Sequence, residues 1–249
     1  MVTCRIDRVW RLTARTCNAR VVEQDYGAFL RKTIRDQRIP IIHIATEMLK
    51  KDEWRSALRA EASVCKAAEH HQAVIEAAAI SFREDGFDGV NVSDIMQKAG
   101  LTHGAFYGHF RSKSALAAAA CRHAFDERLD AWADDVSLTD YLDRYVSTFH
   151  RDRRGRGCPM AAFASDISRQ DKAVQKEYEA GVSRYLERIA SRLSRNGPQR
   201  ATPPYPEATA LLAAMVGSIV LARSTYSNRA LSARILTDSR SFIASRFGV

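Results

Sequence analysis

The amino-acid sequence predicts an all-α protein, and three observations support this prediction. Apolar residues recur at helical spacing in segment after segment from residue 70 to residue 247. Serine, threonine and proline stand where several of these segments begin, and glycine stands where some of them end. No segment shows the strict alternation of a strand. At 249 residues, 46% of them hydrophobic, the chain is long enough to bury a sizeable core.

Residues 1–68 are predicted to be a basic extension. They hold 14 basic and 8 acidic side chains, whereas the rest of the chain holds 24 and 21. Up to about residue 40 no hydrophobic period is sustained, so we expect weak structure there and a helix only over about 41–68. Two readings of the extension stay open. It is a DNA-binding arm, or Met48 is the native start and residues 1–47 are a start-site artefact.

The arm hypothesis depends on five arginines in the first twenty residues. Basic arms of this kind enter the minor groove of DNA and increase the affinity while they contact few base edges. The residues are Arg5, Arg8, Arg11, Arg15 and Arg20.

Residues 69–118 are predicted to form a small helical domain. A first amphipathic helix spans about 70–86, a second 91–99 and a third 102–110, and a fourth begins after Ser112. The second and third are joined by a turn of three or four residues, which is typical of a helix-turn-helix motif.

Local residues support these boundaries. Asn91 and Asp94 have the spacing of a capping box, and Thr102 stands where it can cap the third helix. Gly100 lies in the turn, and Phe106 and Phe110 are four residues apart, so both face the core.

This region resembles the DNA-binding domain of TetR-family transcriptional regulators. More than a dozen positions agree in type and spacing over about forty residues. They are Ala77-Ala78, Phe82, Gly86-Phe87, Asp94-Ile95, Ala99-Gly100-Leu101-Thr102, Gly104, Phe106-Tyr107-Gly108-His109-Phe110, Ser112-Lys113 and Leu116.

The resemblance implies that the third helix enters the major groove of double-stranded DNA. Its exposed first turn would face base edges, and its flanks would meet phosphates. The expected DNA-binding residues are Ser93, Thr102, His103, Gly104, Ala105, Tyr107, His109 and Lys113. Residues 69–126 carry five basic and seven acidic side chains, so the net charge of this domain does not favour DNA. Specific hydrogen bonds and the basic extension would then have to supply the affinity for DNA.

Residues 119–249 are predicted to be a helical effector-binding and dimerisation domain. A helix from 138 to 149 follows a Ser137–Asp140 capping box, and its apolar face, which includes Leu142 and Phe149, is expected to face the core. A short helix starts at Pro159, and a long amphipathic helix covers 171–195. No residue is assigned to the effector.

The last two predicted helices, 207–226 and 231–247, differ in character. The first is apolar almost all round, and such a helix must be covered on every face, so we expect these two helices to form a homodimer interface. The longest charge-free stretch, 208–222, is too short for a membrane helix, so no membrane partner is expected.

The five cysteines are widely spaced and lack a C-x-x-C pair, which predicts neither a disulfide framework nor a zinc site. We expect no cofactor and no metal. Cys158 follows a run of arginines at a helix start, where its thiol is a candidate redox sensor. An inert buried cysteine is the alternative.

The function predicted from these features is that of a ligand-responsive transcriptional regulator in the cytoplasm, associated with the nucleoid. As a homodimer it would repress from a palindromic operator and be released by an unknown small effector. A nonspecific architectural DNA-binding protein is the alternative. The chain shows no HExxH, GxSxG or phosphate-loop motif, so an enzyme is not expected.

Overall fold

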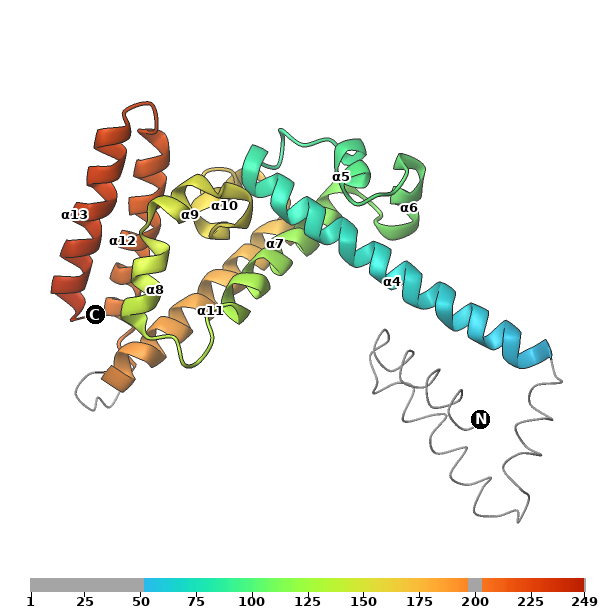
Figure 1. The fold of residues 1–249 in the computed structure, drawn as a ribbon, viewed down its shortest axis with the longest axis horizontal. Coiled ribbons are helices and arrows are strands. Elements are labelled where there is room, and N and C mark those ends of the chain that lie inside the picture. Colours follow the sequence, from blue (N-terminus) through green and yellow to red (C-terminus); the bar gives the residue numbers. More distant parts are fainter. Residues whose placement is uncertain (1–51, 197–202, 249) are drawn as a thin grey trace, which may run out of the picture. The chain divides into compact units, whose positions relative to one another are not determined.

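The computed structural model of the chain describes residues 52–196 and 203–248 (Figure 1). The chain divides into two compact units, Met1–His71 and Gln72–Val249. The described part of the first unit, residues 52–71, is helical. The predictions for residues 1–51, including the arginine arm, lie outside the described residues.

The helix-turn-helix region is entirely helical, as the sequence predicts. Each helix starts or stops close to the expected residue, although the third is divided. The elements are α4 (Asp52–Asp85), α5 (Val92–Lys98), the 3-10 turn η1 (His103–Ala105), α6 (Phe106–His109) and α7 (Lys113–Asp130).

The predicted break between an upstream helix and a helix starting at His70 is wrong. Helix α4 runs without interruption for 34 residues and ends at Gly86, whose φ of +76° is the left-handed conformation of a helix stop. Nothing between residues 64 and 72 breaks a helix, since glycine and proline are absent there and alanine is frequent. Cys65, on this helix, is joined in a disulfide. This bond was not predicted from the sequence, because cysteine spacing is informative for sets of several disulfides and not for one isolated disulfide.

The C-terminal region is also helical, and none of its described residues forms a strand. Its elements are α8 (Leu138–Tyr145), α9 (Thr148–Asp152), η2 (Arg154–Arg156), α10 (Pro159–Phe163), η3 (Ile167–Arg169), α11 (Lys172–Asn196), α12 (Tyr205–Ser224) and α13 (Arg229–Phe247).

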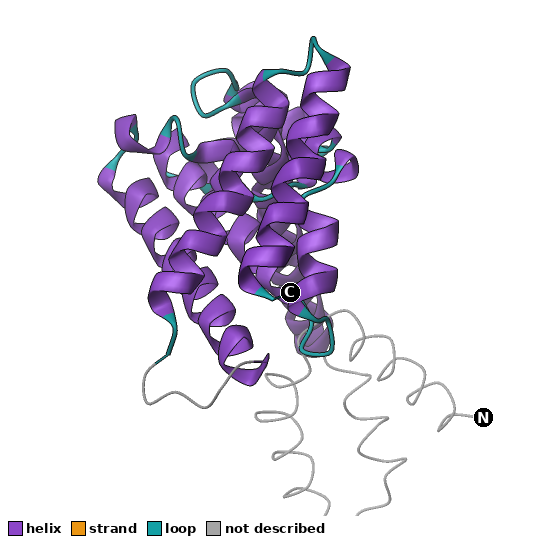
Figure 2. Ribbon diagram, turned by 90° about the vertical axis from the view of Figure 1, so that its left-hand side faces the viewer, coloured by secondary structure: helices purple, strands orange, loops and turns teal. Residues whose placement is uncertain are grey.

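These helices pack as a bundle. Helix α7 lies along α11, and α12 lies beside both α11 and α13 (Figures 1 and 2). Trp132, Tyr185 and Phe125 are among the largest fully buried side chains of this core. The ring of Phe87 packs at a tilt against Phe82 of α4 and Phe163 of α10, with centroids 5.2 and 4.7 Å apart. The core therefore continues from the helix-turn-helix module into the bundle.

The predicted helix over residues 138–149 divides in two. Ser137 caps α8 as expected, but Ser147 caps a new helix by accepting a hydrogen bond from the His150 N–H at 3.2 Å. The change of helical phase turns Phe149 outward. Its side chain is 64% exposed, with the Arg153 guanidinium 3.6 Å above its ring. The prediction that Phe149 faces the core is therefore wrong.

Helix α12 is long and apolar enough to cross a membrane by length and composition, a test that core helices of folded bundles also pass. The charge-free stretch 208–222, on which the sequence prediction of no membrane helix was based, is shorter than this helix. Seven residues of α12, among them Leu211, Met215 and Ile219, are buried within the bundle.

Candidate nucleic-acid interface

The turn of the helix-turn-helix motif is built on Gly100. Its φ of +72° is a conformation that side chains disfavour, and it lets the chain reverse directly after α5. The Leu101 N–H donates to the carbonyl oxygen of Met96 at 2.9 Å, and the Gly100 N–H donates to that of Gln97 at 3.0 Å. These two bonds satisfy the last carbonyls of α5 and fix the direction of the segment that follows.

The segment after the turn, residues 102–110, is named the recognition segment here. The sequence predicts one helix over it, whereas the structure has a 3-10 turn, His103–Ala105, that leads into the single turn of α6. Phe106 and Phe110 are 2% and 7% exposed, and their rings stack at 6.1 Å. These two anchors hold the segment against the core, and the side chains between them point elsewhere.

The expected capping by Thr102 and Asn91 is wrong in detail. Both residues occupy N-cap positions, but neither side chain makes the capping hydrogen bond. Thr102 is an exposed residue. Ser112, in contrast, caps α7 as predicted by accepting a hydrogen bond from the Ala115 N–H at 3.1 Å.

The structure brings the predicted DNA-binding residues to the surface around this segment. Tyr107 is 74% exposed, and its ring meets Phe106 edge-on at 5.3 Å. A Cβ added at Gly104 would have no atom within 4 Å, so a ligand can approach the backbone there. Ser93, Thr102, His103, Gly104 and Tyr107 are exposed, and Ala105, His109 and Lys113 are partly exposed.

One residue of this surface escaped the sequence reasoning. Arg111 is exposed and lies between α6 and the cap of α7, where Lys113 begins the helix. A basic residue beside a helix start adds to the positive potential of the helix dipole. Its place next to the Ser112 cap was the signal that could have found it.

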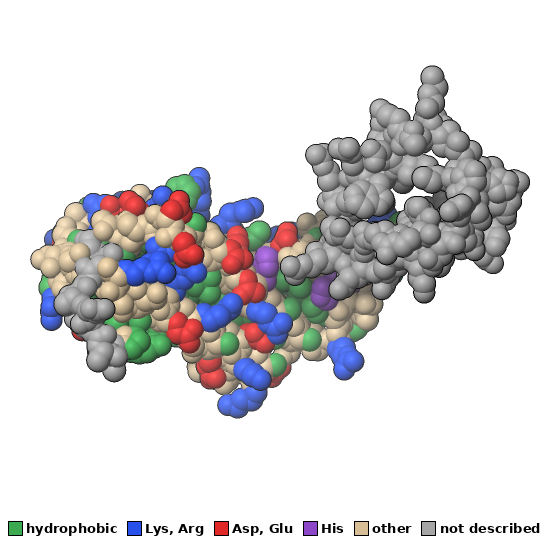
Figure 3. Space-filling model, turned by 90° about the horizontal axis from the view of Figure 1, so that it is seen from below, with side chains coloured by type: hydrophobic (Ala, Val, Ile, Leu, Met, Phe, Trp, Pro, Cys, Tyr) green, Lys and Arg blue, Asp and Glu red, His purple; other side chains and the backbone are tan. Residues whose placement is uncertain are grey.

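The local charge differs from that of the module as a whole. Residues 100–113 carry Arg111, Lys113 and two histidines and no acidic side chain, although residues 69–126 are net acidic. On the face shown in Figure 3, by comparison, Lys and Arg alternate with Asp and Glu over the described surface. The recognition segment and its flank therefore form a locally basic, exposed surface, the kind that a phosphate backbone attracts.

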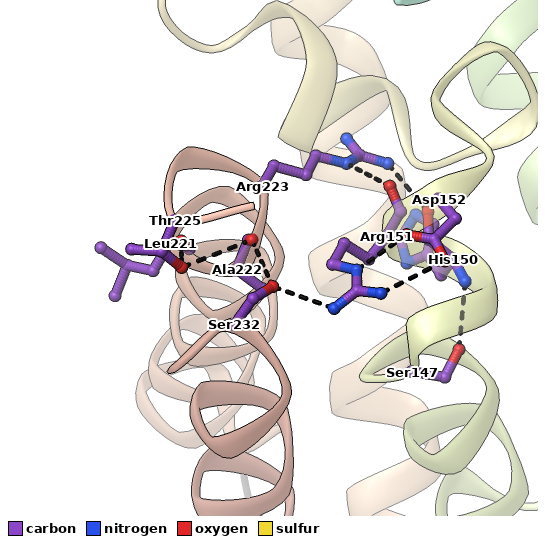
Figure 4. A network of polar contacts seen from close by, with 9 residues as sticks. All are labelled: Ser147, His150, Arg151, Asp152, Leu221, Ala222, Arg223, Thr225 and Ser232. Atoms are coloured by element: carbon purple, nitrogen blue, oxygen red, sulfur yellow. Dashed lines mark hydrogen bonds and ion pairs between the residues drawn. The ribbon is translucent and has the colours of Figure 1, made fainter. Parts of the chain in front are cut away.

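The C-terminal bundle uses its charged residues differently. Arg151 is 6% exposed and donates to the Ser232 hydroxyl at 2.9 Å, and this hydroxyl donates to the Ala222 carbonyl at 2.6 Å (Figure 4). Arg223 donates to the carbonyl oxygens of His150 and Arg151 at 3.0 and 3.2 Å. These bonds tie α9 to α12 and α13.

His150 is part of the same network. Its Nδ1 hydrogen-bonds the Tyr145 carbonyl at 2.7 Å, and its Nε2 accepts the Cys158 N–H at 2.8 Å. The second bond requires a lone pair on Nε2, so the imidazole is neutral with its proton on Nδ1. Burial lowers the pKa of His150 to about 4.

The Cys158 thiol lies inside this bundle. The side chain is 1% exposed, at the N-cap of α10. A redox-sensing thiol has to meet its oxidant, so the burial disfavours the sensor hypothesis and favours the inert alternative. Within residues 52–196 and 203–248, no group of three His, Cys, Asp or Glu could hold a metal ion.

Helices α12 and α13 expose the apolar side chains that the dimer prediction needs. Val220 and Leu221 on α12 are 38% and 57% exposed, and Phe242 on α13 is 68% exposed. Exposed large apolar groups on neighbouring helices are typical of protein interfaces.

Two sequence profiles match the chain. The profile described as "Bacterial regulatory proteins, tetR family" matches residues 74–120, and the profile "Transcriptional regulator LmrA/YxaF-like, C-terminal domain" matches residues 136–234. Together they cover both the helix-turn-helix module and most of the bundle.

Similar proteins include an uncharacterized HTH-type transcriptional regulator in the lacX 3' region of Lactococcus lactis, 25% identical over 56% of this chain and 76% of its own length. The HTH-type transcriptional repressor DhaR of Mycobacterium sp. strain GP1 is 27% identical over 43% of this chain and 56% of its own.

Solved structures with the same fold include a TetR transcriptional regulator from Chloroflexus aurantiacus, with a TM-score of 0.60 and 24% identity over 72% of this chain and 94% of the other. The reduced form of E. coli NemR has a TM-score of 0.58 and 17% identity over 71% and 95%.

Proposed function

Because the chain belongs to the TetR family of bacterial transcriptional regulators and is a ligand-responsive DNA-binding regulator, we propose that it is a homodimeric repressor of a palindromic operator. Effector binding in the C-terminal bundle would favour a conformation whose two recognition segments no longer match the half-sites. A cytoplasmic location follows from this proposal, as does the absence of an enzymatic role.

The observation that carries the proposal is the recognition segment. It is anchored by Phe106 and Phe110 and exposes Tyr107, and the acid-free run in which it lies includes the basic flank of Arg111 and Lys113. In this proposal His103, Gly104 and Ala105, on the first turn, face base edges. Phosphates are met by Thr102, Tyr107, His109 and Lys113, and Ser93 touches the groove wall.

The dimer is supported by the apolar side chains that α12 and α13 expose, which in this proposal are covered by a second copy. A two-fold dimer places its recognition segments one helical turn of DNA apart, about 34 to 36 Å, so the operator is expected to be palindromic. Sedimentation of the Leu221→Asp variant tests this interface. We expect the introduced carboxylate to dissociate the dimer, and a variant that is still dimeric would mean that the interface lies elsewhere.

The test of the function is selection of bound fragments from random duplex DNA at near-physiological salt. We expect the full chain to enrich a palindrome, and Tyr107→Ala to lose it. Tyr205→Ala, a second exposed tyrosine at the start of α12, serves as the matched control and should retain the palindrome.

A chain that begins at Met48, run in parallel, measures what the basic extension adds. Binding without an enriched sequence, dependent on residues 1–47 and steeply weakened by salt, would instead identify a nonspecific architectural DNA-binding protein.

A further inference from the structure

A cluster of polar side chains lies inside the C-terminal bundle and adjoins the network of Figure 4 at His150. Tyr141 and Tyr145 come from α8 and Tyr185 from α11, and each is 5% exposed or less. Arg128, on α7, and Cys158, at the cap of α10, are their electrostatic neighbours. The Tyr141 and Tyr185 hydroxyls lie 3.5 Å apart. Three helices thus place one guanidinium and three hydroxyls in one region of the core.

Two members of this cluster are poorly satisfied. The buried Nε of Arg128 has no hydrogen-bond partner, and the buried Tyr145 hydroxyl has as its neighbour the thiol of Cys158, a weak hydrogen-bonding group. Among the described residues, Arg128 enters no hydrogen bond or ion pair with another side chain. The adjacent carboxylate, Glu127, pairs with Arg83 at 2.8 Å. Leaving such groups unsatisfied costs free energy in folding, and the cost is recovered when a ligand satisfies them.

The cluster is suited to a negative charge. Burial raises the pKa of Tyr141, Tyr145 and Tyr185, so all three remain neutral and can donate their protons. The basic side chains near the cluster are Arg128 and Arg188, both of which act on Tyr141, and His150 is uncharged near neutral pH. A guanidinium with hydroxyl donors around it is the set that recognises a carboxylate or a similar oxyanion.

Aromatic rings border the same cluster. Trp132 stacks on Tyr141 with centroids 3.8 Å apart and planes 8° from parallel. Phe125 meets Tyr185 edge-on at 6.1 Å and Tyr178 at 5.6 Å. A ligand that places its charge on Arg128 would therefore have an apolar body in contact with these rings.

We propose that the effector is a small organic anion with an apolar body, whose oxyanion binds Arg128 and the hydroxyls of Tyr145, Tyr141 and Tyr185. The proposal rests on the proposed function and names the chemical class of its effector. Arg128 is partly exposed, so part of its side chain reaches solvent.

A short series of contacts leads from the cluster toward the DNA-binding module. Tyr145 and Cys158 are neighbours, and the residue before Cys158, Gly157, accepts a hydrogen bond from Arg83 of α4 at 3.3 Å. Gly155 packs so closely on Glu84 of α4 that an added Cβ would lie 2.4 Å from its carboxylate. An anion that moves the segment of residues 155–158 therefore moves a segment in contact with the end of α4.

The test uses benzoate as the probe, with benzamide as its uncharged isostere, on the full chain. We expect benzoate at a hundred times its Kd to raise the Tm of the wild type by about 5 °C. Benzamide should leave the Tm unchanged.

Arg128→Met should abolish the benzoate shift. Arg122→Met, on the same helix but exposed and paired with Glu177, should retain it. Tyr145→Phe removes only a hydroxyl group, whose neighbour in the fold is the Cys158 thiol. This variant should fold normally and weaken benzoate binding severalfold even if Arg128→Met folds poorly.

No benzoate shift in the wild type, or an equal shift in Arg128→Met and Tyr145→Phe, overturns the proposal. Operator binding is measured on the same samples without benzoate. Loss of operator binding alone counts against the proposed function, and loss of the benzoate shift alone counts against the effector class.

Discussion

The recognition segment and the C-terminal bundle use polar side chains in opposite ways. Tyr107 and Thr102 are exposed, and Thr102 lacks even the capping bond that its position allows. Arg151 and Arg223, in the bundle, have their donors engaged by Ser232 and by backbone carbonyls (Figure 4). Substitutions in the first region should therefore change binding, and substitutions in the second should change the free energy of unfolding.

The largest expected effect is that of Arg83→Met, at the boundary between the two regions. Arg83 is 3% exposed and donates to the Ala79 carbonyl, the Gly157 carbonyl and Glu127. Removing the guanidinium deletes three hydrogen bonds in a buried place and should lower the free energy of unfolding by about 3 kcal/mol, measured by urea denaturation. The exposed pair of Arg122 is the control, because Arg122→Met should cost less than about 1 kcal/mol. If both variants lost the same free energy of unfolding, burial of the Arg83 guanidinium would not explain its effect.

The second effect is a pH dependence from His150. Its pKa is about 4 in the fold and about 6.5 in the unfolded chain, so the unfolded state binds more protons between these values. The stabilisation is complete above pH 6.5 and is lost as the pH falls toward 4, by about 3 kcal/mol in all.

Urea denaturation between pH 7 and pH 4 measures this slope. His150→Gln should flatten it, whereas His103→Gln in the exposed recognition segment should leave it unchanged. A slope that persists in His150→Gln would assign the dependence to other groups.

The sequence predicted much of the helix-turn-helix module because local rules decide it. Phe106 and Phe110 have the spacing of a buried pair, and Ser112 is a cap in the structure as in the prediction. Thr102 shows the limit of these rules, because whether a hydroxyl completes a cap depends on rotamer and solvent.

The bundle was less predictable because its contacts join distant residues. Phe149 lies on the expected stripe of a helix, but Ser147 starts a new one and changes the phase. The cluster of Arg128, Tyr145 and Tyr185 comes from three helices, and no periodicity along the chain brings these residues together.

A smaller effect is expected from adding one methyl group at a bundle glycine. A Cβ at Gly181 would lie 2.3 Å from the ring of Phe125, which is fully buried and has no room to move. Gly181→Ala should cost about 2 kcal/mol. Gly217→Ala, in α12, meets nothing within 4 Å and should gain up to about 1 kcal/mol from helix propensity. Thermal denaturation gives the Tm of both variants. A Gly181→Ala variant with the Tm of the wild type would show that the Phe125 ring can move to make room for the methyl group.

The smallest effect on stability is expected from the same change at Gly104. An added Cβ there has no neighbour within 4 Å, so Gly104→Ala should alter the free energy of unfolding by less than about 0.5 kcal/mol. Its operator affinity should nevertheless fall about tenfold, because the methyl group would occupy the space that a base edge needs. Titration of the selected duplex measures this loss, and an unchanged affinity would remove Gly104 from the contact surface.

The two aromatic anchors of the recognition segment also bear on how such a regulator can evolve. Because the buried rings of Phe106 and Phe110 secure the segment to the core, exposed positions such as Thr102 and Tyr107 can change with little loss of stability. Under the proposed function, a descendant of this chain could acquire a new operator by a few substitutions while it kept the proposed effector site and dimer interface. A change of effector would require coordinated substitutions on several helices. Fewer substitutions are therefore needed to change the target genes of this fold than to change its effector.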